Sequence, residues 1–313
     1  MREINKPSFD IDKIINDCKK HFLNNIVSNK SKDDELKLLR QMLMEKEKGY
    51  IVAGKNHSLD KVPQIQANEI QCFPFLKSYK YIYSVRKTYR QEIACLASYT
   101  CPICGSSFGY GTLELDHVLP KSKYSDYSLI PINLIPICSA CNSGKNDYVG
   151  NQKEGILSPY FDSYKLSDLL KFHICIKDNT LKVNISIINE SEFAQINGLI
   201  KDDMLIKRYN HIKHHINIHK VIITLELKAG SVLDQIIYLL SENFLFDELL
   251  NEKIEEYLIY IQPNILQIYM NEEVIKTKII ESIINDKNKE EIYKVLSNMI
   301  KMSQKNRINK VMI

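Results

Sequence analysis

The sequence predicts an α+β protein that is mostly helical, with a cysteine-rich centre between two helical regions. Three observations support this prediction: helical spacing of apolar residues in 79–99, a concentration of Gly, Pro and Cys over 100–160, and two alternating runs around an Asp-Asn turn in 172–188. The chain has 313 residues, of which 44% are hydrophobic and 26% charged, as in ordinary globular proteins. This length suffices for two or three domains.

The N-terminal region, residues 1–78, is predicted to be helical and irregular. Residues 31–50, SKDDELKLLRQMLMEKEKGY, place apolar side chains close to helical spacing, with Ser31 as the N-cap and Gly49 as the stop. A polar stretch containing Pro63 follows and is typical of a loop.

A strong helix candidate, residues 79–99, opens the predicted middle domain, 79–160. Its apolar positions form one stripe, and Arg86, Lys87 and Arg90 lie off that stripe. The predicted C-terminal domain, 161–313, begins with the hairpin and continues as helices to the end of the chain, with a break at a proline. We expect these three parts to be separate regions of structure.

The charge and hydropathy patterns narrow the protein class. A net charge of +4 and a pI near 8.4 are compatible with nucleic-acid binding but do not argue for it alone. The opening MREINKPSFD lacks the apolar core of a signal peptide, and no apolar run approaches a membrane span. We therefore expect a cytoplasmic protein without a membrane partner, whose cysteines are ligands or buried thiols and not disulfides.

Four of the eight cysteines form two Cys-x-x-Cys pairs, CPIC at 101–104 and CSAC at 138–141. Two such knuckles together supply the four thiolates of a tetrahedral structural Zn²⁺ site. The alternatives are four buried thiols that never bind metal, or a redox dithiol, which two pairs around a long insert do not resemble. The spacing favours structural zinc on Cys101, Cys104, Cys138 and Cys141.

The insert between the knuckles carries residues that suit phosphodiester cleavage. Asp116 and His117 are neighbours on a predicted strand, Asn133 follows, and Asn142 comes directly after the last cysteine. A neutral histidine can remove the proton from a water near neutral pH. Mg²⁺ takes one or two protein oxygens and keeps its waters, so one carboxylate and one amide suffice. The simpler reading of Asp116-His117 is a solvated strand end.

This D-H … N … C-x-x-C-N-x-x-K pattern resembles the HNH endonuclease family, in its zinc-knuckle subgroup, over roughly residues 95–150. The resemblance implies a ββα-metal fold and metal-dependent hydrolysis of nucleic acid, with DNA as the expected substrate. It implies His117 as general base, Asp116 and Asn142 as ligands of one catalytic ion, and Asn133 as the residue that orients His117. Many relatives have histidine where Asn142 stands, and asparagine favours Mg²⁺ or Mn²⁺.

Basic residues surround this insert. Lys121, Lys123 and Lys145 are candidates for phosphate contacts, although exposed lysines are common on any surface. Residues 71–150 hold eight Lys/Arg against five Asp/Glu, and this basic excess lies mostly on the helix 79–99. Glu114 shares a strand face with Asp116. It could be an acid near the metal ligands, but we predict that it is an exposed strand residue.

The segment GILSPYFDSY, with the hairpin and helices after it, more loosely resembles the C-terminal extension of HNH proteins encoded with an ATPase in anti-phage systems of the Septu and retron type. This resemblance implies a nuclease effector that works with an ABC/AAA-type ATPase, docked on the C-terminal half. An extension that clamps nucleic acid is the competing reading. A zinc-knuckle binding module with dormant or lost catalysis is the alternative for the whole chain.

The segment HIKHHINIH places His211, His214, His215 and His219 within nine residues. On a helix, the first, third and fourth of these would line one face. A metal site is one reading, but no acidic or cysteine partner lies nearby in sequence. The preferred reading is a polar helix face.

Overall fold

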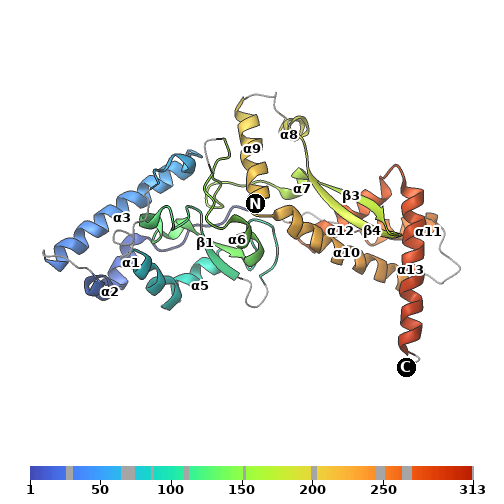
Figure 1. Ribbon diagram of the computed structural model, residues 1–313, viewed down its shortest axis with the longest axis horizontal. Helices are drawn as coiled ribbons and strands as arrows, with labels where there is room; N and C mark the ends of the chain where they lie inside the picture. The colour runs from blue at the N-terminus through green and yellow to red at the C-terminus, as the bar shows by residue number, and fades with distance from the viewer. Residues whose placement is uncertain are drawn as a thin grey trace. The chain divides into compact units, whose positions relative to one another are not determined.

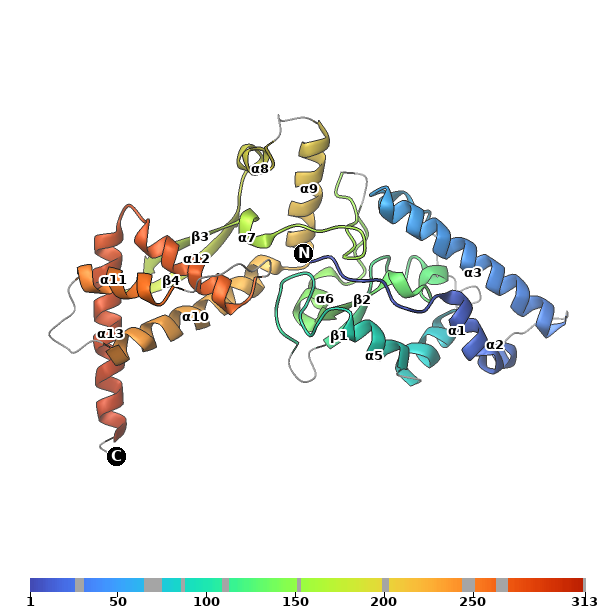
Figure 2. The ribbon, with the colours of Figure 1, turned by 180° about the vertical axis from the view of Figure 1, so that it is seen from behind.

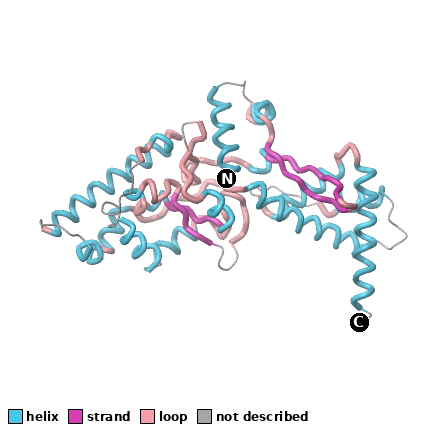
Figure 3. The backbone as a smooth tube through the Cα atoms, viewed as in Figure 1, coloured by secondary structure: helices cyan, strands magenta, loops and turns pink. Residues whose placement is uncertain are grey.

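The computed structural model describes residues 1–25, 31–64, 75–85, 88–108, 113–150, 153–198, 203–243, 251–262 and 270–311. Helices dominate these residues, and the strands form two separate two-stranded sheets (Figure 3). The predicted α+β, mostly helical class is therefore confirmed. Within the described chain, no helix is long and apolar enough to cross a membrane.

The chain divides into two compact units. The first comprises Met1–Tyr164 and Ile200–Val221, and the second comprises Lys165–Leu199 and Ile222–Ile313. Helix α9 (Asp203–Ile218) therefore belongs to the first unit, although the second unit's hairpin precedes it in sequence. The division at residues 78 and 160 stays a prediction.

The N-terminal helices of the first unit are α1 (Ile11–Asp17), α2 (Lys19–Asn25) and α3 (Lys32–Lys55) (Figure 1). Ser31 is the N-cap residue of α3, but its side chain makes no capping hydrogen bond. The predicted stop at Gly49 is wrong, because α3 continues past it to Lys55. A Cβ at Gly49 would meet nothing within 4 Å, so this glycine is simply carried on an open helix face.

The predicted helix 79–99 forms in two parts, a π-helix η2 (Lys80–Val85) and an α-helix α5 (Thr88–Cys95). Ser98 and Tyr99 have positive φ angles, 47° and 60°, which end the helical path before the first cysteine pair. The predicted basic residues at 86 and 87 lie outside the described residues.

The centre of the first unit is a ββα arrangement. Strand β1 (Leu113–His117) pairs antiparallel with β2 (Leu134–Cys138), and α6 (Ser139–Lys145) follows directly. The register sets His117 opposite Leu134, so the Asp-His pair lies at the end of β1 where the loop that connects to β2 begins. Strand β2 is buried throughout, which explains its apolar sequence LIPIC. Two short 3₁₀ turns, η3 (Ser125–Tyr127) and η4 (Pro131–Asn133), lie in the loop between the strands.

The second unit is built on the predicted hairpin, β3 (Leu170–Lys177) and β4 (Thr180–Ile187). Asp178 and Asn179 at its tip both have φ near 55°, as a two-residue hairpin turn requires. Helices α12 (Glu272–Ile284) and α13 (Lys289–Val311) pack against the two strands (Figures 1 and 2). The remaining helices of this region are α7 (Leu166–Leu169), α8 (Glu190–Ile196), α10 (Val221–Asn243) and α11 (Asn251–Tyr260). The predicted break at Pro263 falls outside the described residues.

Candidate functional site

The two Cys-x-x-Cys pairs come together as one buried cluster. The four sulfur atoms all lie within 4.8 Å of one another, and Cys104 Sγ lies 3.7 Å from Cys138 Sγ. Tetrahedral thiolates at the usual Zn–S distance would be about 3.8 Å apart. Hydrogen bonds from the other thiols, that of Cys101 first, hold the pKa of Cys104 well below its ordinary value. The donor set and its spacing therefore fit Zn²⁺.

The turn of the first pair explains its sequence. Gly105 has φ 74° and its N–H donates to the carbonyl of Cys101, while the Cys101 N–H donates to the carbonyl of Ser106. A left-handed residue is needed at this point, and glycine adopts it without strain. The second pair instead uses the end of β2 and the first turn of α6. The rigid strand-helix junction therefore places Cys138 and Cys141 opposite the turn.

Helix α9 covers the cluster from behind. His219 Nδ1 lies 3.0 Å from the carbonyl oxygen of Cys141, and His215 Nδ1 lies 2.9 Å from the hydroxyl oxygen of Tyr164. A Cβ at Gly144 would lie 2.7 Å from the carbonyl oxygen of Ile218, so α6 and α9 approach too closely for a side chain there. The helical face predicted for these histidines exists, but it is buried and not a solvated polar face.

The four cysteines form the sole metal-ligand group of three or more His, Cys, Asp or Glu side chains among the described residues. The structure therefore gives the histidine cluster no metal site within that part of the chain. His211, His215 and His219 are all buried, and His215 and His219 make the two contacts described above. The sequence lacked any signal for this burial, since the hydrogen-bond partners of His215 and His219 lie 51 and 78 residues away.

His117 is the last residue of β1, and only 4% of its surface is exposed. Its Nε2 lies 3.2 Å from the carbonyl oxygen of Ser128. A carbonyl oxygen only accepts, so Nε2 must carry the hydrogen and Nδ1 keeps a lone pair. Burial lowers the pKa of His117 to about 3, so the ring is neutral near pH 7. A neutral imidazole with a defined tautomer is the state that a general base needs.

Asn133 organises the loop between the two strands. It is fully buried; its Oδ1 accepts from the Leu119 N–H at 2.8 Å, and its Nδ2 donates to the carbonyls of Leu119 and Tyr127, both at 3.1 Å. Ser128, whose carbonyl fixes His117, is the next residue after Tyr127. Asn133 thus bonds to the loop that carries the histidine's partner, and not to the imidazole itself.

Asp116 and Lys145 form a largely buried ion pair. Lys145 Nζ lies 2.9 Å from Asp116 Oδ2 and donates to the carbonyl oxygen of His117 at 2.7 Å. Burial raises the pKa of Asp116, and the Lys145 ammonium opposes that shift. Lys145 was predicted to contact phosphate from a surface, but the structure buries it and turns it towards β1.

Asn142 and Glu114 form a second link between α6 and β1. The Asn142 amide Nδ2 donates to the Glu114 carboxylate. A carboxylate only accepts, so Asn142 must present its nitrogen to Glu114 and turn its carbonyl oxygen elsewhere. Asn142 and Lys145 are three residues apart, and their partners Glu114 and Asp116 share one face of β1. Glu114 is half-buried and not the exposed strand residue that we expected.

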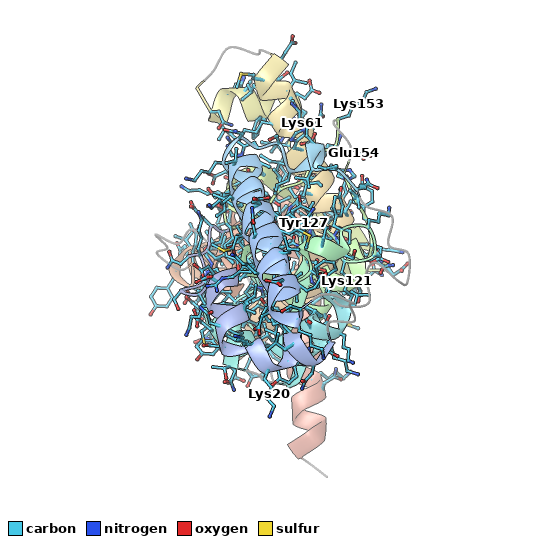
Figure 4. All side chains as sticks on the ribbon, turned by 90° about the vertical axis from the view of Figure 1, so that its left-hand side faces the viewer. Lys20, Lys61, Lys121, Tyr127, Lys153 and Glu154 are labelled. Atoms are coloured by element: carbon cyan, nitrogen blue, oxygen red, sulfur yellow. The ribbon has the colours of Figure 1, made fainter. Side chains whose placement is uncertain are left out.

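Tyr79 is a residue near the site that the sequence did not indicate. Its ring centroid lies 4.7 Å from that of His117, and Lys121 Nζ lies 5.2 Å from the tyrosine ring centroid. Lys121 and Lys123 are both exposed, and Figure 4 labels Lys121 among the side chains of the first unit. A positively charged, partly aromatic surface therefore adjoins the buried histidine.

Comparison with known proteins assigns this region to a family. The model of the HNH endonuclease family matches residues 101–148. The chain is 35% identical to protein ea31 of Escherichia phage lambda over 78 residues, which is 24% of this chain and 26% of that protein. It is 31% identical to Septu protein PtuB of Bacillus thuringiensis over 94 residues, which is 30% of this chain and 35% of that protein. The match thus spans about a quarter to a third of these relatives. No solved structure shows a significant match.

Proposed function

Because residues 101–148 carry an HNH endonuclease domain, we propose that the chain is a metal-dependent endonuclease that hydrolyses phosphodiester bonds, in DNA. One observation supports this most directly. His117 is held as a neutral imidazole whose Nε2 is bonded to the Ser128 carbonyl, which leaves Nδ1 to accept a proton from water. A neutral imidazole with one nitrogen fixed as the donor can take up a proton at the other nitrogen, which is the step that a general base performs.

Asp116 and Asn142 are the proposed ligands of the catalytic ion. Their oxygens are hard donors that suit Mg²⁺ or Mn²⁺, which retain water ligands and accept one carboxylate and one amide. Because the Asp116 carboxylate is buried, a neighbouring cation stabilises its charged form. The Asn142 nitrogen is bound to Glu114, so the carbonyl oxygen of Asn142 faces away from Glu114. A bound divalent ion supplies Lewis-acid stabilisation of the phosphoryl oxygens. Asn133 holds the loop that fixes the tautomer of His117.

The remaining residues have supporting roles in this proposal. Zn²⁺ on the four cysteines holds the strand-helix junction that carries Asn142, one residue beyond Cys141. Lys121 and Lys123 contact phosphates of the substrate, because both are exposed and Lys121 lies over Tyr79 beside His117. Lys145 is too deeply buried for such a contact, so we assign it instead to the charge balance of Asp116.

The similarity to Septu protein PtuB supports a role as the nuclease effector of an anti-phage system, and we propose that this effector acts in the cytoplasm. We extend this to cooperation with an ATPase subunit, for which the second unit is the proposed docking element. It is a compact body of its own, separate from the residues that form the nuclease site.

The test is cleavage of plasmid DNA by the full chain with Mg²⁺ or Mn²⁺, with and without any ATPase that co-purifies from the native host. We expect His117→Ala to abolish cleavage while zinc content and circular dichroism stay unchanged. His173→Ala is the matched control, because His173 is an exposed histidine on β3 of the second unit. Full activity of His117→Ala would overturn the assignment of the base.

The Lys145–Asp116 pair favours one alternative, a zinc-knuckle binding module whose catalysis is dormant or lost, since an ammonium already neutralises the proposed metal ligand. That function predicts that the chain shifts DNA in gel-shift experiments but does not cut it, both when the chain is alone and when the ATPase is present. Metal-dependent cutting in either condition would exclude it.

A further inference from the structure

A second pocket of the first unit lies apart from the ββα site. Its volume is about 280 Å³, and its walls come from the end of α3, the segment 157–164 and the first half of α9. The α3 and 157–164 walls are locked together, because a Cβ at Gly54 would lie 2.3 Å from the Phe161 ring. The end of α3 is therefore closely packed against the segment 157–164 beside the pocket. Such a volume approaches the roughly 300 Å³ at which small-molecule sites begin.

Basic side chains line the α9 wall of this pocket. Lys207 and Arg208 are consecutive on α9, and Arg208 Nη2 donates to the carbonyl of Ser163 at 3.4 Å across the pocket wall. An adjoining surface hollow is lined by Lys61, Lys153 and again Lys207, with one acidic residue, Asp203. Figure 4 labels Lys61 and Lys153, which appear near each other in that view. The pocket opening therefore carries an excess of positive charge.

A histidine that follows α3 also lines the pocket and is hydrogen-bonded to a carboxylate. His57 Nδ1 lies 2.7 Å from Asp162 Oδ1, and Asp162 Oδ2 accepts from the Ser158 N–H at 2.9 Å. Both carboxylate oxygens are thus engaged, and the proton of His57 is held on Nδ1. The side chain of His57 is 55% exposed, so Nε2 is accessible to a ligand. An imidazole supported in this way donates to an anion when it is protonated.

The rest of the lining is apolar. Leu157 and Ile212 contribute aliphatic surface, Tyr164 contributes a ring, and Met204 is an 82% exposed methionine at the edge. A pocket whose lining includes Lys207, Arg208 and His57 as well as apolar side chains suits an organic phosphate better than free inorganic phosphate, which would leave the apolar side chains in water.

We infer that this pocket binds a nucleoside phosphate, with the phosphate at Arg208, Lys207 and His57 and the nucleoside against Leu157 and Ile212. The ligand is either a free nucleotide or the 5′-phosphorylated end of a nucleic-acid strand, which present the same chemistry. This site does not require cleavage at His117, so it stands whether or not the proposed nuclease activity is correct.

The test is calorimetric titration of the full chain with AMP, adenosine and inorganic phosphate. We expect AMP to bind with one site per chain, and adenosine and inorganic phosphate each to bind at least about tenfold more weakly. Arg208→Gln should weaken AMP about tenfold or more, as expected for loss of one charge-assisted hydrogen bond. Lys213→Gln is the matched control, because Lys213 is an exposed lysine on α9 outside the pocket. Thermal melting of each variant checks that it is folded.

A strand end is distinguished from a free nucleotide by competition in the His117→Ala chain, which avoids cleavage. If a 5′-phosphorylated oligonucleotide displaces AMP and the 5′-hydroxyl oligonucleotide does not, the strand end is the ligand; if neither displaces AMP, the free nucleotide is. Absence of AMP binding at millimolar concentration would overturn the inference. So would equal loss in Arg208→Gln and Lys213→Gln, or equal binding of adenosine and AMP.

Discussion

The four-cysteine cluster and the Asp116–His117 site share one scaffold, since Cys141 and Asn142 are consecutive on α6, yet they differ in every other respect. The cluster is uniform: four soft sulfur donors, all buried, with backbone hydrogen bonds fixing its turn. The neighbouring site mixes imidazole, carboxylate, amide and ammonium, and Glu114 at its edge is only partly buried. The comparison shows that a uniform set of thiols suits one structural metal ion, whereas the neighbouring site brings together groups of different charge and hydrogen-bonding character.

Cys138→Ser should have the largest effect, because it removes a ligand from the site on which both regions depend. Structural zinc supplies about 10 kcal/mol or more of folding free energy in small zinc domains. We expect zinc, soluble yield and nuclease activity to be lost together, as measured by metal analysis, fractionation and plasmid cleavage. Cys95→Ser is the control, since Cys95 is exposed and unpaired. A soluble, zinc-free, active Cys138→Ser protein would refute the scaffold role.

Lys145→Met should come next, because it leaves Asp116 as a largely buried carboxylate without its cation. Breaking such a pair typically costs about 3–5 kcal/mol. Urea unfolding should show this loss, and Mg²⁺ should restore more stability in the variant than in the parent chain. Lys123→Met, at an exposed position, should change the free energy of unfolding by about 0.5 kcal/mol or less. If Lys145→Met lowers the free energy of unfolding by less than about 1 kcal/mol, the ion pair does not stabilise the folded site.

Asn133→Ala should destabilise the loop between β1 and β2 while sparing the cluster. It removes three hydrogen bonds and leaves the buried Leu119 N–H unpaired, which costs about 2–3 kcal/mol. Cleavage should fall as well, because the loop carries the Ser128 carbonyl that fixes His117. The control is Asn16→Ala on the exposed face of α1. Unchanged cleavage by a folded Asn133→Ala protein would show that the loop does not orient the base.

Glu114→Gln should have the smallest effect, confined to the catalytic ion. A glutamine both donates and accepts, so it no longer forces Asn142 to turn its oxygen away. In the His117→Ala background we expect Mn²⁺, followed by electron paramagnetic resonance, to bind about five- to tenfold more weakly at unchanged zinc content. The change should shrink in an Asn142→Ala background, because the two residues act together. An equal loss in both backgrounds would point to the charge of Glu114 alone.

Local sequence was sufficient where the chemistry is set by neighbours along the chain. The cysteine pairs, the hairpin turn at Asp178-Asn179 and the strand that ends in Asp116-His117 each depend on a few consecutive residues. The predicted helix stop at Gly49 was wrong for the opposite reason. Glycine weakens a helix by only about 1 kcal/mol, and the packing of α3 outweighs that local preference.

The sequence by itself determined the ligand types: four thiols for the scaffold, and a histidine, an aspartate and two asparagines for the proposed chemistry. Tertiary structure decided which atoms face one another. The Lys145 ammonium reaches β1 across 28 residues, Glu114 meets Asn142 across the same separation, and His219 reaches Cys141 across 78. No local pattern encodes such pairs, because burial and hydrogen bonding between distant segments arise only when α6 packs against β1 and when the end of α9 packs against α6. The tautomer of His117 and the pocket between α3 and α9 are decided in the same way.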